Sequence, residues 1–289
     1  MESVKFDISV VTPSLNQAKF LEATLQSVLS QGYSRLEHIV VDGASEDGST
    51  MIIDAHSDHL ADWVSEPDSG QANAINKGFA KATGDILCWI NSDDLLAPGC
   101  LQRVADYFSN HPDAVWCTGQ CQLINETGVP GQVLEVNAAL PSISWLMHFR
   151  DNRAAILQPS TFWRREAWEA VGPLREDLHY AFDFEFFYRI REHFGPPGQL
   201  DTVLSQFRLH DSSKTVSTGE MFLIEVMDVV REKRSGLSAN DRVIVEAWLA
   251  AERAKECFIR QQKALKQGNF LMHWRWRVLG WAHRIARVF

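Results

Sequence analysis

Hydrophobic and polar positions in the first hundred or so residues alternate between two spacings. Short apolar runs closed by turn-forming residues indicate buried strands, and apolar residues three or four positions apart indicate amphipathic helices. The strands are predicted at 8–11, 38–42, 63–65 and 86–90, and the helices at 20–29, from about 49, at 72–82 and after Pro98. This alternation predicts an α/β fold, with a mostly parallel, Rossmann-like sheet, right-handed crossovers and flanking helices. Ser14 or Asn16 is the predicted cap of the first helix.

The spacing becomes less regular beyond residue 114. A strand is predicted through 115–121, a turn at 128–131 and a helix over 182–194 that ends before the breaker 195–198. Helical spacing then dominates from 221 to the end, with a turn at 235–240. We therefore divide the chain into a domain of two halves, 1–113 and 114–215, and a helical C-terminal extension, 216–289.

Composition and charge exclude several classes of protein. With 45% hydrophobic and 22% charged residues the chain is an ordinary globular protein. Its net charge of -9 argues against a general nucleic-acid binder. Five cysteines without CxxC spacing form neither a disulfide framework nor a zinc site, which favours a reducing, cytoplasmic compartment. Residues 1–7 lack the apolar stretch of a secretory signal, and no run approaches the ~20 apolar residues of a membrane span.

Three of the predicted strands end in polar residues, which is where ligands bind in open α/β sheets. These ends are Thr12-Pro13-Ser14-Leu15-Asn16, Asp42-Gly43 and Asn91-Ser92-Asp93-Asp94. Asp42 suits a carboxylate that accepts hydrogen bonds from a base or ribose, although an aspartate before glycine is also a common turn residue. The adjacent carboxylates after the fourth strand favour a site for Mg²⁺ or Mn²⁺, the alternative being a helix cap.

Several stretches, in this order and spacing, resemble the family 2 glycosyltransferases of the GT-A fold. The resemblance covers most of the first two hundred residues. The matching stretches are 11–16, 40–49, Asn76-Lys77-Gly78 with Ala82-Thr83-Gly84-Asp85, and Asn91-Ser92-Asp93-Asp94. It implies that 1–113 is the nucleotide-sugar-binding half and 114–215 the acceptor half of a catalytic domain.

The resemblance also implies roles on the donor side. Thr12, Pro13, Ser14 and Asp42 would hold the base and ribose, with Asn16 at the end of the same stretch. Asp93 matches the essential last acid of the family's metal-binding Asp-x-Asp motif. The chain departs at Asn91, where many relatives carry aspartate; its amide, with Ser92 beside it, would bind the ribose or a metal-bound water. Lys77 would steady the diphosphate or be a solvated helix lysine.

The acceptor half resembles the family at 158–164 and 180–187. Asp183 matches the catalytic base, and the alternative is that it caps the helix that begins there. Phe182 replaces the glutamate that many relatives have beside this aspartate. In the stretch 206–215, His210 would bind the metal, whereas a lone histidine is usually structural. Ser213 and Lys214 would meet the diphosphate.

The expected function is transfer of a sugar, of the hexosyltransferase type, from a nucleoside-diphosphate donor to an acceptor hydroxyl. The resemblance implies dependence on Mn²⁺ or Mg²⁺, inversion at the anomeric carbon and a place in bacterial cell-surface polysaccharide synthesis, such as O-antigen, capsule or exopolysaccharide. A nucleotidyltransferase is less favoured because 12–16 is no glycine-rich phosphate loop. A non-catalytic nucleotide-sugar-binding module would not need Asp42, Asp93, Asp183 and His210 together.

The C-terminal tail differs from the rest of the chain. No acidic residue follows Glu256, and the stretch 270–281 mixes tryptophans with arginines. This pattern favours an interfacial helix on anionic lipid, at the cytoplasmic face of the inner membrane, where a lipid-linked saccharide would be the acceptor. The alternative is a helix whose tryptophans pack on the catalytic domain.

Overall fold

A computed structural model describes residues 6–138, 153–154, 156–211, 213–214 and 219–266. The chain divides into two compact units, Met1–Ser217 and Thr218–Phe289. The first unit holds the whole sheet and every residue predicted to do chemistry.

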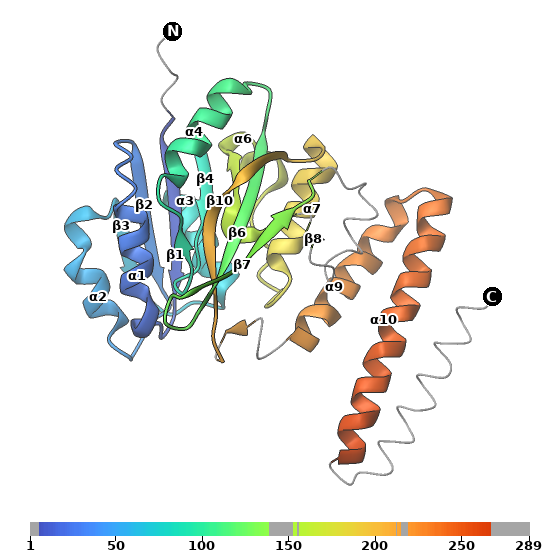
Figure 1. Ribbon diagram of the computed structural model, residues 1–289. Coiled ribbons are helices and arrows are strands. Elements are labelled where there is room, and N and C mark those ends of the chain that lie inside the picture. The colour runs from blue at the N-terminus through green and yellow to red at the C-terminus, as the bar shows by residue number, and fades with distance from the viewer. Residues whose placement is uncertain (1–5, 139–152, 155, 212, 215–218, 267–289) are drawn as a thin grey trace. The chain divides into compact units, whose positions relative to one another are not determined.

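The first unit is built on one large twisted sheet (Figure 1). Its strands run in the spatial order β3-β2-β1-β4-β9-β6-β10-β5, with β7 beside β6 and β8 beside β7. The strands are β1 (Ile8–Ser14), β2 (Leu36–Asp42), β3 (Asp62–Ser65), β4 (Ile86–Trp89), β5 (Leu95–Leu96), β6 (Trp116–Asn125), β7 (Pro130–Val136), β8 (Arg153–Ala154), β9 (Thr161–Arg164) and β10 (Gly198–Leu209).

Strand direction confirms the predicted α/β fold and adds an antiparallel part that the sequence pattern did not predict. Strands β3, β2, β1 and β4 pair in parallel. Strand β9 is antiparallel to both β4 and β6, and β10 pairs in parallel with β6. Two reversals restore the original direction, so β10 runs the same way as β4. Its carboxyl end therefore lies at the same edge of the sheet as those of β1, β2 and β4.

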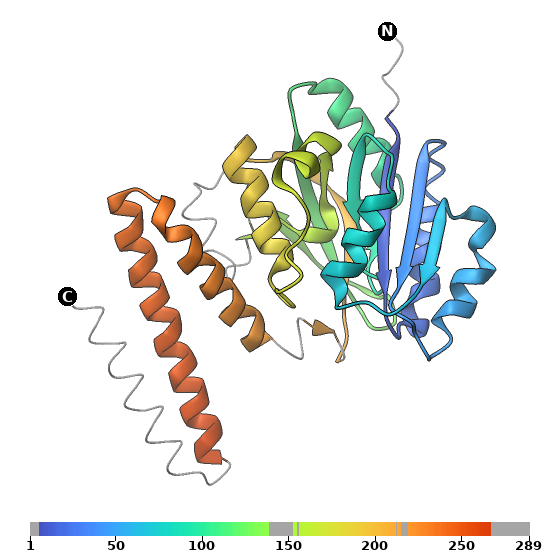
Figure 2. The same ribbon diagram turned by 180° about the vertical axis from the view of Figure 1, so that it is seen from behind.

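Helices cover both faces of this sheet. In Figure 1 α1 and α4 lie in front of the strands, and in the reverse view of Figure 2 α3, α6 and α7 lie in front. The helical segments of this unit are α1 (Ala18–Leu29), α2 (Ser49–Ala55), α3 (Gln71–Lys81), α4 (Cys100–Asn110), α6 (Arg165–Val171), α7 (Phe182–Phe194) and the short 3-10 turns Ser57–His59 and Gln158–Ser160.

Aromatic side chains fill the core between the sheet and α7. Trp89 of β4 stacks on Phe187 with ring centroids 5.5 Å apart, and Trp163 of β9 packs edge-on against Phe186 at 5.2 Å. All four side chains are buried. Burial of one such ring contributes on the order of 1.5–3 kcal/mol, so this cluster holds α7 firmly against the sheet.

Close packing of α3 on β1 explains one of the motifs. A Cβ atom at Gly78 would lie 2.4 Å from Cγ1 of Val11, so only glycine allows this approach. Asn76 and Lys77 precede Gly78 on the same helix and are carried to the edge of the donor half with it. The Asn-Lys-Gly motif is thus partly a packing requirement of the helix–sheet interface.

Most predicted elements appear with small shifts of boundary. The helix over 182–194 is confirmed at both ends. The prediction that Ser14 or Asn16 caps the first helix is wrong: Gln17 is the N-cap and makes no side-chain capping bond. Asn16 instead adopts a positive φ of 53° and accepts a hydrogen bond from the Glu46 amide (2.9 Å), which joins the loops after β1 and β2.

The second unit is helical in its described part. It contains α9 (Gly219–Lys233), a 3-10 turn (Arg234–Gly236) and α10 (Ala239–Lys266). In the described part of the chain, no helix combines the length and apolar character needed to cross a bilayer. The basic aromatic stretch 270–281 lies outside the described residues.

Candidate functional site

Polar side chains gather where β1, β2, β4 and β10 end. Parallel strands present their carboxyl ends at one edge, and this edge is where open α/β sheets bind ligands. Ser14 closes β1, Asp42 closes β2, Asn91 follows β4 and His210 follows β10. Residues that are far apart in sequence thereby share one edge.

Asp93 and His210 form the centre of this edge. Their side chains lie 3.0 Å apart, between Oδ2 of Asp93 and Nε2 of His210, although 117 positions separate them. Strand β5 brings them together because it follows Asp94 directly and pairs antiparallel with β10. The Asp93 carboxyl is one-fifth exposed, whereas the imidazole is buried.

Arg208 helps to hold the Asp93–His210 pair in place. It precedes His210 by two positions on the extended chain, so both side chains are on the same face. Its Nε donates to the carbonyl of Asp93 (2.8 Å), and its guanidinium lies 5.1 Å from the ring of Phe20. The His210 ring lies 4.5 Å from the same phenyl ring. Phe20, on α1, thus packs against both residues and restricts how His210 can turn.

Asp94 has a different role from its neighbour. It is 1% exposed, its Oδ1 accepts the amide of Arg208 (2.9 Å) and its Oδ2 accepts from Asn91 (3.3 Å). Burial raises the pKa of Asp94 well above its usual range, and the charge of Asp93 adds to this. Asp94 is therefore a structural link between β4 and β10, whereas the Asp93 carboxyl is the partly exposed one, accessible to a ligand.

The Asp93–His210 pair fits a divalent cation that takes most of its ligands from a substrate. Within the described residues no group of three His, Cys, Asp or Glu side chains is arranged to hold a metal alone. A hard cation such as Mg²⁺ or Mn²⁺ needs only one or two protein carboxylates when phosphate oxygens and water complete its shell. One carboxylate and one imidazole at a strand edge are consistent with that arrangement.

Asn91 belongs to a hydrogen-bonded row of amide side chains. Its Oδ1 accepts from Gln71, the first residue of α3 (2.8 Å), and its Nδ2 donates to Gln158 (3.3 Å). Lys214 donates to Oε1 of Gln71 (2.9 Å). Asn91 and Lys214, both predicted site residues, are thus joined through Gln71, which the sequence analysis did not predict.

The ends of β1 and β2 form the part of the edge predicted to hold a base and ribose. The Asp42 carboxylate is buried and accepts bonds from the amide and hydroxyl of Ser45 (2.8 and 2.5 Å) and from Ser65 (2.8 Å). The hydroxyl of Ser14 is buried and has no hydrogen-bond partner among the described residues. A buried hydroxyl without a partner is costly, which suits a group that binds a ligand.

Other predicted donor residues face inward or pair with neighbours. Thr12 and Pro13 are buried, and the Thr12 hydroxyl lies 3.0 Å from Nε2 of His38. Lys77 forms an ion pair with Glu66 (2.6 Å) and donates to the carbonyl of Pro67 (3.2 Å). The role of Lys77 toward a diphosphate stays a prediction that requires this ion pair to open.

Ser92 and Ser213 lie in the two segments that meet at the edge. Both are 5% exposed. The amide of Ser213 donates to the carbonyl of His210 (3.0 Å), which folds the chain back just after β10. This turn brings Lys214 to Gln71.

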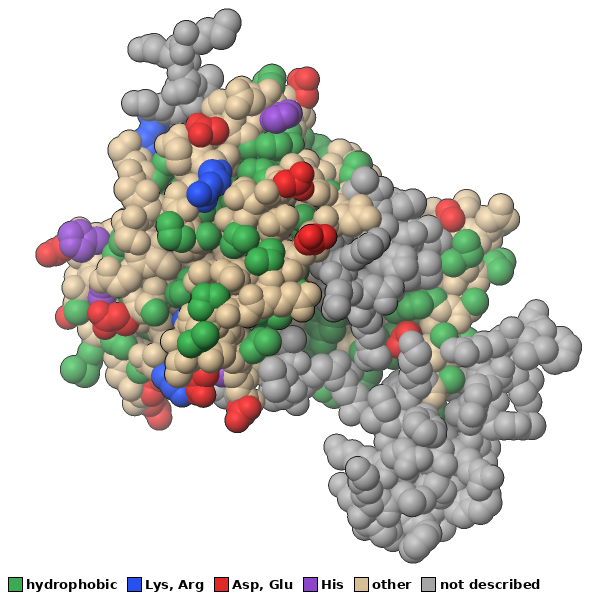
Figure 3. Space-filling view, in the orientation of Figure 1, with side chains coloured by type: hydrophobic (Ala, Val, Ile, Leu, Met, Phe, Trp, Pro, Cys, Tyr) green, Lys and Arg blue, Asp and Glu red, His purple; other side chains and the backbone are tan. Residues whose placement is uncertain are grey.

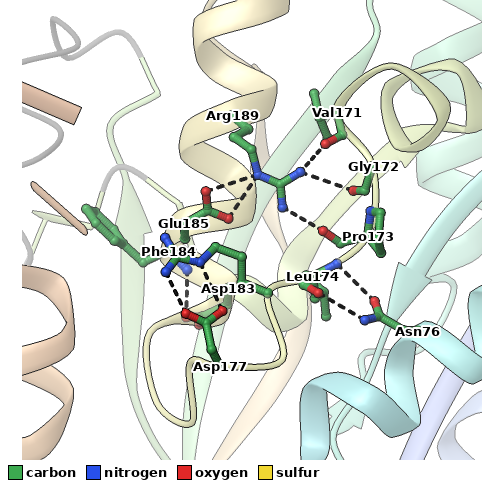
Figure 4. Close-up of polar contacts among 11 residues, drawn as sticks. Asn76, Val171, Gly172, Pro173, Leu174, Asp177, Asp183, Phe184, Glu185 and Arg189 are labelled. Atoms are coloured by element: carbon green, nitrogen blue, oxygen red, sulfur yellow. Dashed lines mark hydrogen bonds and ion pairs between the residues drawn. The ribbon is translucent and has the colours of Figure 1, made fainter. Parts of the chain in front are cut away.

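Asp183 lies in the first turn of α7, where its Oδ1 accepts the amide of Phe184 (2.7 Å; Figure 4). The N-cap of that helix is Ala181, so Asp183 is not the capping residue. The ring of Phe182 lies 6.4 Å from Trp89, the last residue of β4. Lys214 donates to the carbonyl of His179 (3.3 Å) and lies over the ring of Tyr180. These contacts bring the residues flanking Asp183 to the edge occupied by Asn91.

Sequence reasoning missed Arg208 and the role of Gln71. Arg208 carried a signal, because alternation along β10 puts positions 208 and 210 on one face. Gln71 carried no such sequence signal, since its role depends on the position of α3 relative to β4.

Among the described residues on the face seen in Figure 3, Lys and Arg side chains are few and lie apart. That face lacks the continuous basic surface typical of nucleic-acid binders.

Comparison with known proteins adds sequence relatives. The family model "Glycosyl transferase family 2" matches residues 9–165. An uncharacterised glycosyltransferase of Nostoc is 29% identical over 180 residues, 58% of this chain and 53% of that protein. One of Mycobacterium tuberculosis is 30% identical over 186 residues, 63% of this chain and 68% of that protein. TuaG of Bacillus subtilis, named for teichuronic acid biosynthesis, is 31% identical over 126 residues, 43% of this chain and 50% of that protein. The chain thus spans about half to two thirds of these relatives.

Solved structures share the fold at low identity. TarS of S. aureus (residues 1–349), in complex with UDP-GlcNAc, has a TM-score of 0.64 at 15% identity and covers 97% of this chain and 92% of that one. The mannosyltransferase PcManGT of Pyrobaculum calidifontis, in complex with GDP-Man and Mn²⁺, has a TM-score of 0.55 at 16% identity and covers 99% and 88%. Both similarities extend over nearly the whole chain.

The buried His38 beneath the edge predicts a pH-dependent stability. Burial, with a smaller contribution from His56, lowers the pKa of His38 from 6.5 to about 3. The unfolded state therefore binds the extra proton between these pH values. The free energy of unfolding should fall as pH decreases through this window, by up to ~1.4 kcal/mol per pH unit. Denaturant unfolding of the wild type and His38→Asn, at several pH values, should show a shallower decrease in the variant. Equal slopes would contradict this assignment.

Proposed function

This chain belongs to glycosyltransferase family 2, and we propose that it moves a sugar from a nucleoside-diphosphate donor to an acceptor hydroxyl with the help of a divalent cation. The observation that carries the proposal is the Asp93–His210 pair, 3.0 Å apart at the edge where β4 and β10 end. A carboxylate and an imidazole held together there by Arg208 and Phe20 are poised to share one ligand.

The donor is a nucleoside-diphosphate sugar whose base and ribose lie over the ends of β1 and β2. The buried hydroxyl of Ser14 and the carboxylate of Asp42 are the polar groups that would contact them. Thr12 and Pro13 would line this part of the site through their backbone, since their side chains face the interior. The complexes of TarS with UDP-GlcNAc and of PcManGT with GDP-Man support this class of donor.

Asp93 and His210 would hold the cation, and Asn91 would bind a water of its shell or the ribose. A divalent cation such as Mn²⁺ or Mg²⁺ held by these residues would supply positive charge to offset the negative charge of the leaving diphosphate. The complex of PcManGT with Mn²⁺ supports a cation of this kind. Lys214 would add a positive charge to this site, where its hydrogen bond to Gln71 holds it. Ser213 would order the turn that carries Lys214.

Asp183 would accept the proton of the attacking hydroxyl. Its place in the first turn of α7, next to Phe182 and therefore near the end of β4, supports this role. A base of this type contributes ~10²–10⁴-fold to the rate. If the hydroxyl attacks from the face opposite the diphosphate, the anomeric configuration is inverted.

The acceptor belongs to a bacterial cell-surface polysaccharide pathway in this proposal. The name of TuaG, a teichuronic acid biosynthesis glycosyltransferase of Bacillus subtilis, supports this class. A lipid-linked saccharide is the acceptor that would match the basic aromatic stretch at 270–281, which we propose associates with anionic lipid at the cytoplasmic face of the membrane.

Substitution of Asp93 should abolish metal-dependent donor binding. Calorimetry with UDP-, GDP-, dTDP- and CMP-sugars, with and without Mn²⁺, should find one nucleotide class whose binding is strengthened by the metal. Asp93→Asn removes the charged ligand and should weaken that binding by tenfold or more, an effect of about 1.4 kcal/mol. Asp54→Asn, an exposed carboxylate on α2, is the matched control. If no donor binds, a non-catalytic role or another substrate class takes the place of this proposal.

Substitution of Asp183 should separate binding from turnover. Asp183→Asn keeps the size of the side chain and removes its basicity, so donor affinity should stay within about twofold while nucleoside diphosphate release falls ~10²-fold or more. Release is measured with the donor that binds best, in the presence of a panel of saccharide acceptors. Full turnover by the variant would exclude Asp183 as the base.

The C-terminal tail should bind anionic vesicles. The intact chain should co-sediment with vesicles containing phosphatidylglycerol and not with phosphatidylcholine alone, and added salt should release it. The double variant Arg275→Glu with Arg277→Glu reverses two charges of the tail and should lose this binding. Equal sedimentation with both kinds of vesicle, or no effect of the substitutions, would reject membrane association through this stretch.

A further inference from the structure

The segment that leads into Asp183 is held by two helices. It runs from the end of α6 at Val171 to the start of α7 at Phe182 (Figure 4). One set of contacts comes from α3, on the donor side of the unit, and another from α7 itself. Together they fix the backbone that precedes Asp183.

The contacts with α3 and with the loop just before it are made by amide, hydroxyl and carboxylate groups. Asn76 accepts the amide of Leu174 (2.9 Å) and donates to its carbonyl (3.0 Å) and to Oε1 of Glu176 (3.0 Å). Oε2 of Glu176 accepts from Asn73 (3.0 Å) and from Ser69 (3.3 Å). We call these five residues the Glu176 cluster. Hydrogen bonds from Asn76 and Asn73 lower the pKa of Glu176, so the cluster binds it as a carboxylate.

The contacts with α7 are made by Arg189. Its Nε donates to both oxygens of the buried Glu185 (2.9 and 3.1 Å). Its remaining nitrogens donate to three consecutive carbonyls, those of Val171, Gly172 (3.2 Å) and Pro173 (2.8 Å). A guanidinium has five donors in one rigid plane, so it can bind all these groups at once, whereas a lysine cannot.

Helix α3 connects this segment with the donor edge. Gln71, its first residue, donates to Asn91 at 2.8 Å. Asn76 follows five positions later, a rise of about 7.5 Å along the helix axis. A single short helix therefore carries one end of the amide row beside Asp93 and also the cluster that holds the segment before Asp183.

We infer that Asn76, Glu176 and Arg189 are positioning residues that hold Asp183 at a fixed place relative to the donor edge. This inference rests on the proposed function, since it takes Asp183 as the base. When a reaction needs groups from two distant parts of the chain, the distance between those groups must stay fixed. A misplacement of ~1 Å can lower the rate ~10²-fold. The aromatic core fixes α7, and these polar contacts fix the chain that enters it.

Hydrogen–deuterium exchange of the intact chain tests the positioning without any ligand. Glu176→Gln and Arg189→Lys should raise exchange of amides in 172–185 by about tenfold, because each removes bonds to that segment. Asp177→Asn is the matched control: it alters the adjacent carboxylate, which pairs with Arg175 on the surface. Unchanged exchange in β1 and β4 shows that the variants remain folded. Equal exchange in all three variants would overturn the inference.

Turnover tests the connection with Asp183. With UDP-GlcNAc and GDP-mannose as probes and Mn²⁺ present, Glu176→Gln should lower kcat for nucleoside diphosphate release about tenfold and change donor affinity less than about twofold. In the Asp183→Asn background it should cause no further loss, because its effect passes through that residue. Additive losses would reject the positioning role.

The outcomes distinguish the inference from the proposed function. If the wild type releases no nucleoside diphosphate, or Asp183→Asn keeps full turnover, the proposed function fails. The exchange experiment still decides whether the Glu176 cluster and Arg189 hold the segment. If Asp183→Asn is inactive while Glu176→Gln and Arg189→Lys match the wild type, only the positioning role fails.

Discussion

His210 can reach Asp93 because β10 runs in the same direction as β4. The antiparallel strand β9 lies between β4 and β6, and β10 pairs in parallel with β6, so two reversals bring the end of β10 to the edge where β4 ends. With the opposite direction, position 210 would lie at the far side of the sheet. The short strand β5 then closes the distance, since it ties the chain just after Asp94 to β10.

This placement has an electrostatic cost that neighbouring groups offset. Two adjacent carboxylates repel each other, and burial of one of them disfavours its charge. Asp94 is the buried member, and the backbone amide of Arg208 and the side chain of Asn91 donate to it. The side chain of Arg208 also donates to the backbone carbonyl of Asp93, so the same residue bonds the carboxyl of Asp94 and the backbone of Asp93. Asp93 is left with its carboxyl turned toward His210 and partly exposed.

Much of the fold could be predicted from local pattern, because apolar runs and helical spacing reflect burial on each element. No long-range information was needed to predict the helix 182–194 or the two strands that end near Asp42 and Asn91. The insertion of antiparallel β9 and the cap at Gln17 were not predicted, since they depend on tertiary pairing and on the loop contact between Asn16 and Glu46. For the candidate site, the pairing of Asp93 with His210 rested on a family resemblance. The local pattern of apolar and polar residues cannot predict a contact between two residues that are 117 positions apart in the sequence.

In the proposed mechanism, Asp93 and His210 together would bind the cation that accompanies a nucleoside diphosphate. Pulsed electron paramagnetic resonance of Mn²⁺, added to the protein with UDP and separately with GDP, tests it directly. We expect coupling of Mn²⁺ to one imidazole nitrogen in the presence of the nucleotide class that binds, and loss of that coupling in His210→Asn. Bound Mn²⁺ without nitrogen coupling, or coupling that persists in the variant, would contradict it.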